Sequence, residues 1–192
     1  ADVIVVDGMQ GGTGATQECF IEHVGIPTLP AVRMAAEALK ELGMHREGVQ
    51  LIVSGGIRSG ADVAKAIALG ADAVSIGTAA LIALGDNNPD LEEEYNKLGT
   101  TAGFYDEWQA GDDPAGITTQ DEKLAARLDP KKGGEKLANY LKVLTLEAQT
   151  LARACGKSHI RNLEPEDLNA LTLEASAMAK VPLAGTDWIP GK

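Results

Sequence analysis

The sequence is poor in cysteine, and this shortage excludes two classes of protein. Only two cysteines occur among the 192 residues, Cys19 and Cys155, and they lie far apart in the chain. Two cysteines cannot build a disulfide framework, and no CxxC pair marks a metal or redox site. We therefore expect reduced thiols, no metal site and a cytoplasmic location.

Basic residues are also scarce, because 17 Lys and Arg face 28 Asp and Glu, which gives a formal net charge of -11. Such a surface repels the phosphates of nucleic acid unless a basic stripe is present. The adjacent pair Lys131 and Lys132 makes no such stripe, since Asp129 and Glu135 flank it. No apolar run approaches the roughly 20 residues that a membrane-spanning helix needs. We expect no nucleic-acid partner and no membrane partner.

Glycine, in contrast, is abundant, and its 22 residues gather where apolar runs end. Three such runs, residues 3–6, 51–53 and 73–76, are continuous rather than alternating, which predicts parallel strands buried on both faces. Helical patterns follow them at residues 30–42, 61–69 and 79–84. This order predicts an α/β fold made of three βα units. An open doubly wound sheet and part of a barrel both fit the pattern.

The rest of the chain divides into two further parts. Residues 87–121 read as a loop insertion with a short acidic helix near 91–98. Residues 122–192 read as a helical extension, in which a long helix at about 134–155 is followed by a second helix from Glu164. We expect these two helices to form a hairpin. The predicted division is therefore 1–86, 87–121 and 122–192.

Two glycine-rich strand ends predict a phosphate site. Five residues follow the second strand, namely Ser54, Gly55, Gly56, Ile57 and Arg58, and Gly77 and Thr78 follow the third. Glycine leaves backbone N–H groups accessible, and the helix N-termini behind these loops favour an anion. The last two βα loops of a (β/α)8 barrel often bind phosphate in this way. The alternative is that the glycines only make tight turns, and that Arg58 pairs with an acidic neighbour.

The loop after the first strand indicates which phosphate-containing ligand the site binds. It reads DGMQGGTGA from Asp7 and includes Gly11, Gly12 and Thr13, and it resembles the DGxxGGTGA loop of glutamate synthase FMN domains. Residues 77–85, GTAALIALG, resemble the same family almost letter for letter. Residues 114–121, PAGITTQD, resemble the family's PVGIATQD. The three motifs stand in family order.

This resemblance implies a fold, a cofactor and a reaction. The chain would hold the last three βα units of an FMN-type (β/α)8 barrel, with the other units, about five, supplied by upstream sequence or another chain. Its three glycine loops would bind FMN. The family joins ammonia from glutamine to 2-oxoglutarate to make glutamate, working with amidotransferase-like domains or subunits. We expect part of a multisubunit flavoenzyme, and no residue stands out as catalytic.

The sequence departs from the family where cysteines ligate an iron–sulfur cluster. Asp86 and Asp113 stand at those positions, with no cysteine between them. Carboxylates are poor ligands for such clusters, so we expect none in this region. The cluster-ligating cysteines are also absent from proteins that resemble the FMN subunit of N-methylglutamate synthase. Those proteins act on glutamate and methylamine. A third possibility is an assembly subunit without chemistry of its own.

Overall fold

The computed structural model describes residues 1–12, 17–99 and 110–191. The chain forms two compact units. Unit 1 contains residues 1–12, 23–76 and 143–192, and unit 2 contains residues 13–22 and 77–142. The predicted division at 86 and 121 concerns domain organisation within the family and stays a prediction.

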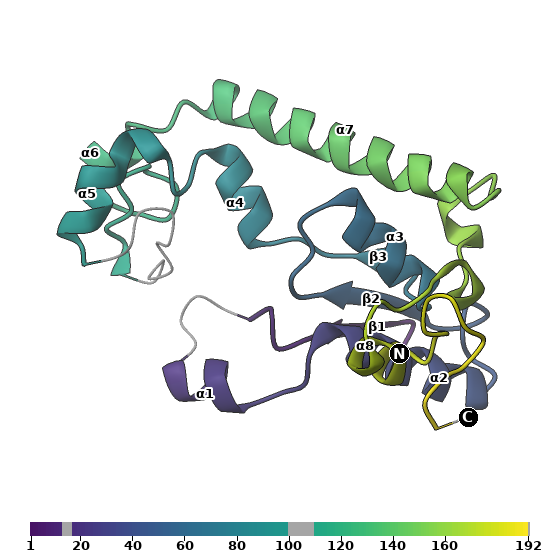
Figure 1. Ribbon diagram of the computed structural model, residues 1–192. Coiled ribbons are helices and arrows are strands. Elements are labelled where there is room, and N and C mark those ends of the chain that lie inside the picture. The colour runs from purple at the N-terminus through teal and green to yellow at the C-terminus, as the bar shows by residue number, and fades with distance from the viewer. Residues whose placement is uncertain (13–16, 100–109, 192) are drawn as a thin grey trace. The chain divides into compact units, whose positions relative to one another are not determined.

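A small parallel sheet organises unit 1. Its strands are β1 (Val3–Asp7), β2 (Gln50–Ser54) and β3 (Ala73–Val74), in the spatial order β1-β2-β3 (Figure 1). Val3 lies opposite Gln50 and Asp7 opposite Ser54, so β1 and β2 end at the same edge of the sheet. The predicted mixed α/β class with parallel strands is confirmed. The short β3 continues its pairing with β2 through a hydrogen bond from Ser75 N to Val53 O of 2.8 Å.

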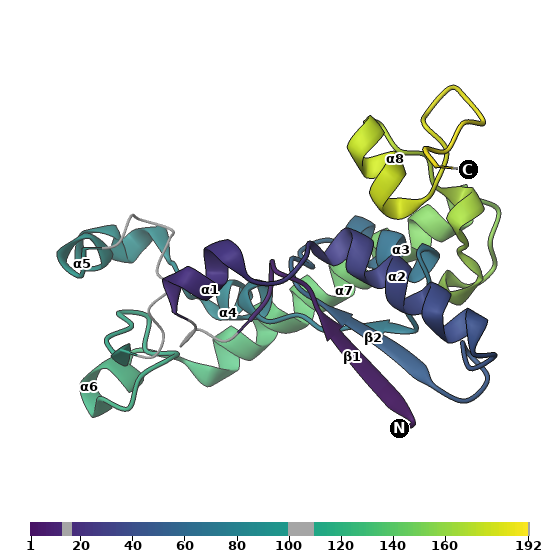
Figure 2. The same cartoon turned by 90° about the horizontal axis from the view of Figure 1, so that it is seen from below.

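Helices α2 (Thr28–Glu41) and α3 (Gly60–Ala68) cover one side of this sheet (Figure 2). Leu51 and Val53 of β2 point to that side and are fully buried. On the other side, Val3 is 45% and Val5 60% exposed. Within this chain, β1 is therefore buried on one face only, and not on both faces as predicted. The reason is that β1 is an edge strand and no described residue covers its second face.

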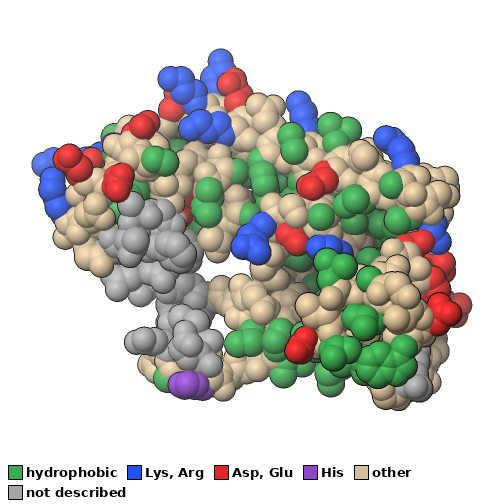
Figure 3. All heavy atoms as spheres, viewed as in Figure 1, with side chains coloured by type: hydrophobic (Ala, Val, Ile, Leu, Met, Phe, Trp, Pro, Cys, Tyr) green, Lys and Arg blue, Asp and Glu red, His purple; other side chains and the backbone are tan. Residues whose placement is uncertain are grey.

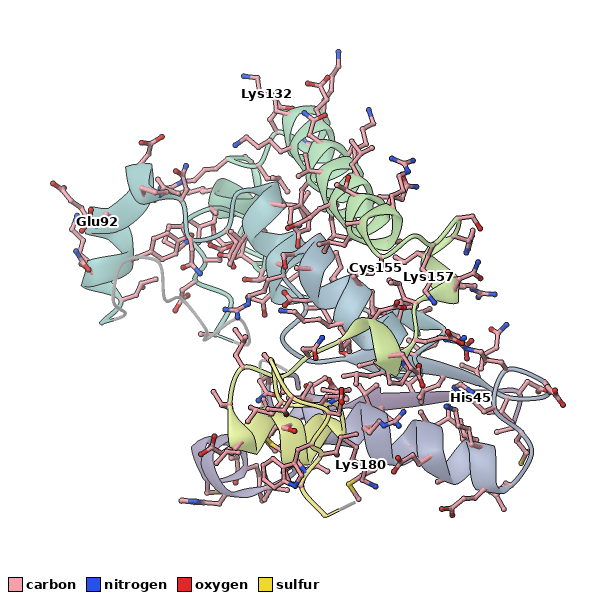
Figure 4. The ribbon with its side chains drawn as sticks, turned by 45° about the vertical axis from the view of Figure 1, so that its right-hand side comes forward. His45, Glu92, Lys132, Cys155, Lys157 and Lys180 are labelled. Atoms are coloured by element: carbon pink, nitrogen blue, oxygen red, sulfur yellow. The ribbon has the colours of Figure 1, made fainter. Side chains whose placement is uncertain are left out.

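Helix α3 has strong signals at both ends. Ser59 is the N-cap and forms a capping box with Asp62, in which each side chain accepts a hydrogen bond from the other residue's backbone N–H. Gly70 follows the helix at a φ of +119°, which an L side chain rarely adopts. His45 Nε2 lies 2.8 Å from Gly70 O at this end of the helix (Figure 4). These signals explain why α3 lies within one residue of its predicted bounds.

The end of unit 1 differs from the predicted helical hairpin. Helix α7 (Pro130–Ala154) matches the predicted long helix, with an earlier start, but no continuous helix follows Glu164. After η3 (Ile160–Asn162), a capping box between Glu164 and Asp167 closes the single turn η4 (Pro165–Asp167). The backbone then extends, because Ala170 pairs with Pro182 and Ala184, and helix α8 (Leu173–Ala179) starts only after Thr172 caps it.

Helix α8 packs on α2, and an ion pair supports this contact. Lys180, directly after α8, binds Glu37 of α2 (Figure 4). Glu37 also pairs with Arg33 at 3.4 Å. Apolar side chains remain exposed around α8 and the C-terminal segment, among them Leu171, Leu173 and Trp188 (Figure 3).

Unit 2 consists of short helices and the first half of α7. Its elements are α1 (Glu18–His23, whose last residue belongs to unit 1), α4 (Thr78–Leu84), η1 (Pro89–Leu91), α5 (Glu92–Lys97) and α6 (Glu122–Ala125). The predicted helices at 79–84 and 91–98 are confirmed to within a residue. Arg127 links α5 to the segment at Pro114, because its Nη1 donates to Glu94 Oε2 at 2.7 Å and to Pro114 O at 3.0 Å. No helix of the described residues is long and apolar enough to cross a membrane.

Candidate functional site

The loops that follow β1 and β2 lie against each other at one edge of the sheet. Gly8 N donates to Ser54 O at 3.1 Å, and Gly11 N donates back to Gly8 O at 2.8 Å. A Cβ placed on Gly11 would lie 2.0 Å from Asp7 Oδ1 and 3.0 Å from Gly55 Cα. The structure therefore brings four of the predicted site residues together, namely Asp7, Gly11, Ser54 and Gly55.

Gly55 and Gly56 form a cradle that only glycine permits. Their φ angles are +105° and +77°. A Cβ on Gly55 would lie 2.7 Å from Thr28 Oγ1, and one on Gly56 would lie 3.1 Å from Gln10 Cβ. Within the described residues, the backbone N–H groups of Gly55, Gly56 and Ile57 have no acceptor. Three successive unpaired amides in a turn suit an anion.

The start of α3 contributes less to this cradle than the sequence predicted. Asp62 Oδ2 accepts from the backbone N–H groups of both Arg58 and Ser59 at 3.0 Å. Glu147 Oε2, from α7, accepts from Gly60 N at 2.7 Å. Two carboxylates already occupy these amides and offset the positive end of the helix. The donors left for a ligand are those of residues 55–57, and Arg58 is exposed beside them.

Thr28 and Gln10 join the two loops, and neither residue was predicted from the sequence. Gln10 Oε1 accepts from Thr28 N and from Thr28 Oγ1, each at 2.8 Å. Thr28 Oγ1 also lies 3.0 Å from Gly55 O, to which it donates. Thr28 follows the N-cap Pro27, and no side chain caps the start of α2, so no local capping pattern marks this residue. Its contacts with residues 18 and 27 positions away follow no sequence pattern.

The remaining predicted residues are placed differently. Gly77 is the N-cap of α4 and Thr78 its first residue, and both belong to unit 2. Their expected pairing with the residue 54–58 loop therefore stays a prediction. Gly12 is exposed and has a φ of +136°. Thr13 lies outside the described residues.

Asp86 and Asp113, at the positions where the family resemblance implies cysteines, are both buried in unit 2. Asp86 Oδ1 accepts from Asn87 N at 2.9 Å. The hydroxyl of Tyr95 donates to Asp113 Oδ1 at 3.2 Å and accepts from Asn87 N at 3.1 Å. Asp113 also accepts three backbone N–H groups at 2.8–3.1 Å, from Ala115, Ile117 and Thr118.

This cluster holds the Tyr95 hydroxyl in its protonated form. Burial raises the pKa of Tyr95 well above its ordinary value, and the nearby carboxylates of Asp113 and Asp86 raise it further. The raised pKa favours the protonated hydroxyl, which donates to Asp113. Among the residues that the structure describes, no group of three or more His, Cys, Asp or Glu side chains is arranged to hold a metal ion.

Comparison with known proteins identifies the family. A family model described as a conserved region in glutamate synthase matches residues 1–88 and 109–158. A glutamate synthase large subunit-like protein of Rhizobium meliloti is 73% identical over 192 residues, which is 100% of this chain and 43% of that protein. An archaeal glutamate synthase [NADPH] of Methanocaldococcus jannaschii is 43% identical over 163 residues, 85% of this chain and 29% of that protein.

A more distant relative is the chloroplastic ferredoxin-dependent glutamate synthase of Oryza sativa, 34% identical over 154 residues, 80% of this chain and 8% of that protein. The chain thus spans less than half the length of these curated relatives. The unmatched residues 89–108 fall inside the predicted insertion at 87–121. Since the family model covers more than half of the sequence, and includes both loops of the cradle, this chain belongs to the glutamate synthase family.

Proposed function

We propose that this chain is the FMN-binding part of a glutamate synthase-like oxidoreductase, and that unit 1 holds the FMN phosphate. The observation that supports this most is the row of three amides at Gly55, Gly56 and Ile57, which have no acceptor among the residues that the structure describes. The loop after β1, with Asp7, Gly11, Gly12 and Thr13, would line the flavin beside them. Gly77 and Thr78 would complete the phosphate site, as Ser54 and Arg58 would at its rim.

The exposed face of the sheet supports a barrel in the complete protein. Val3, Val5 and Ile52 alternate along that face, which ends in the polar residues Asp7 and Ser54 at the carboxyl edge. An apolar interior with polar groups at the carboxyl ends of the strands is the arrangement of a (β/α)8 barrel, whose active site lies at that end. We propose that further βα units, from upstream sequence or another chain, cover this face.

The reaction we propose is the transfer of nitrogen to 2-oxoglutarate to form glutamate, with ammonia delivered by an amidotransferase-like partner in the cytoplasm. Bound FMN, once reduced by an external electron donor, would supply the hydride. The residues of this chain would hold the phosphate and fix the flavin against the carboxyl edge of the sheet, since orientation is the protein's main contribution in cofactor enzymes. No residue of this chain is proposed as a catalytic acid or base.

A second candidate is the formation of N-methylglutamate from glutamate and methylamine. The observation that favours it is the pair Asp86 and Asp113, which are tied into a hydrogen-bonded cluster with Tyr95 and Asn87. Carboxylates at these positions are not ligands for an iron–sulfur cluster. An exchange of one amine for another needs less net input of electrons than a reductive amination.

The test is to purify the complete protein with its subunits, record its visible spectrum and identify any released flavin by chromatography. We expect bound FMN. Glutamate formation from 2-oxoglutarate, glutamine and a reductant is then compared with N-methylglutamate formation from glutamate and methylamine. A colourless complex without FMN would overturn both enzyme proposals and leave a non-catalytic assembly subunit.

A further inference from the structure

We propose that Thr28 is a positioning residue for the phosphate cradle, because its hydroxyl fixes the orientation of the Gly55–Gly56 peptide. The inference rests on the proposed function, in which the amides of residues 55–57 bind the FMN phosphate. It adds a role for a residue that belongs to neither glycine loop, since Thr28 is the first residue of α2.

The geometry of the peptide bond carries the argument. Thr28 Oγ1 donates to Gly55 O at 3.0 Å. In a trans peptide the carbonyl and the following N–H point in opposite directions, and no peptide of this chain is cis. Holding Gly55 O against Thr28 therefore directs Gly56 N–H away from Thr28. Gly56 N is one of the three amides without an acceptor in the described part of the chain.

The peptide between Gly55 and Gly56 can rotate easily, so a hydrogen bond is needed to fix its orientation. Both Gly55 and Gly56 have positive φ angles, and glycine populates positive and negative φ with similar ease. Rotation of the whole peptide plane would exchange the positions of the carbonyl and the amide. The carbonyl oxygen would then face the phosphate, and two partially negative groups repel each other. The Thr28 hydrogen bond opposes this rotation.

Gln10 holds Thr28 in place for this task. Thr28 N can only donate, so the atom of Gln10 that faces it at 2.8 Å is the amide oxygen. The same oxygen lies 2.8 Å from Thr28 Oγ1, so the single hydroxyl proton is shared between Gln10 Oε1 and Gly55 O. Gly8 packs against the opposite side of the Thr28 hydroxyl, because a Cβ on Gly8 would lie 2.1 Å from Thr28 Oγ1. The Thr28 side chain therefore has little space to move toward Gly8.

The test uses the complete protein with Thr28→Val, which keeps the shape of the side chain and removes the hydroxyl, and Thr28→Ser, which keeps the hydroxyl. Thr150→Val in the exposed part of α7 is the matched control. FMN and riboflavin are titrated into each apoprotein. One hydrogen bond of this kind corresponds to a change of roughly three- to tenfold in affinity.

We expect Thr28→Val to weaken FMN binding by this factor and to leave riboflavin binding unchanged, because riboflavin has no phosphate. Thr28→Ser and Thr150→Val should bind both flavins as the wild type does. Equal FMN affinity in Thr28→Val and wild type would overturn the role of Thr28 alone. So would an equal loss for both flavins, which would indicate general damage to the fold. A wild-type protein that binds neither flavin would overturn the proposed function and this inference with it.

Discussion

Tyr95 shows how buried polar groups of unit 2 satisfy one another. Its side chain is fully buried, yet its hydroxyl both donates to Asp113 and accepts from Asn87 N. Asp113 is equally buried and also accepts backbone N–H groups of the segment that follows it. Buried polar groups are tolerated only when they are paired in this way. The cluster therefore fixes residues 113–118 against α5.

The pKa of Tyr95 leads to a prediction about alkaline pH. Burial, with the carboxylates of Asp113 and Asp86, raises this pKa in the folded state. An unfolded tyrosine ionises near pH 10, so above about pH 10 the unfolded chain releases a proton that the folded chain retains. The contribution of Tyr95 is complete below that pH and is lost as pH rises, by about 1.4 kcal/mol per pH unit.

Tyr95→Phe isolates this effect, because phenylalanine cannot ionise. We expect the difference in unfolding free energy between wild type and Tyr95→Phe, measured by urea denaturation, to be constant from neutral pH to about pH 9 and to shrink above about pH 10. A difference that stays constant up to pH 11 would show that Tyr95 ionises in the folded protein as it does in the unfolded chain.

At the scale of the elements, α3 and α7 approach each other closely at Gly60. A Cβ on Gly60 would lie 2.3 Å from Leu144 O and 2.6 Å from Ala148 N, which are backbone atoms of α7 and cannot move aside singly. Gly60→Ala should therefore destabilise the protein by about 1–3 kcal/mol through overpacking, although alanine favours a helix by about 1 kcal/mol over glycine. Thermal or urea unfolding measures the difference.

Gly134→Ala is the matched control, since Gly134 also lies in a helix but has no atom within 4 Å of the added Cβ. There only the helix propensity acts, so this variant should gain up to about 1 kcal/mol. The two substitutions are chemically identical, and opposite signs are expected. If both variants were stabilised, the close contact at Gly60 would not exist in solution.

The same elements show what the sequence can predict. Helices α2 and α3 were found because a regular apolar stripe and a following glycine are local signals, and Gly43 and Gly70 do follow them at positive φ. The segment after Glu164 has the right apolar spacing for a helix, but the capping box of Asp167 and the pairing of Ala170 with Pro182 override it. The capping box is local, whereas the pairing of Ala170 with Pro182 forms only when the chain turns back on the far side of α8.

The residues of the candidate site also divide into those that the sequence predicts and those that it does not. The glycine loops were found because Gly55, Gly56 and Gly11 are needed for backbone geometry, which leaves a mark in the sequence. Thr28 and Glu147 were not predicted, since each acts through hydrogen bonds to residues far along the chain. A polar residue that binds a loop from another element has no fixed sequence spacing from that loop, so no pattern predicts it.

At the scale of the whole molecule, a substitution on the exposed face of the sheet tests the proposed barrel. Val5 is 60% exposed on that face. If further βα units cover it in the complete protein, Val5→Lys places an unpaired charge in an apolar interior, at a cost of several kcal/mol. Leu42→Lys is the control, because Leu42 is 71% exposed at the end of α2, on the helical side of the sheet, where a lysine is tolerated within about 0.5 kcal/mol.

We therefore expect Val5→Lys in the complete protein to abolish soluble expression or flavin content, while Leu42→Lys behaves as the wild type in both. The two positions have similar exposure in this chain, and the lower preference of lysine for a strand accounts for no more than about 1 kcal/mol. A larger loss at Val5 requires a covering layer over the β1 side. Soluble, flavin-loaded Val5→Lys protein would show that this face is open to solvent and would remove the barrel from the proposal, while the phosphate cradle of residues 55–57 would stand without it.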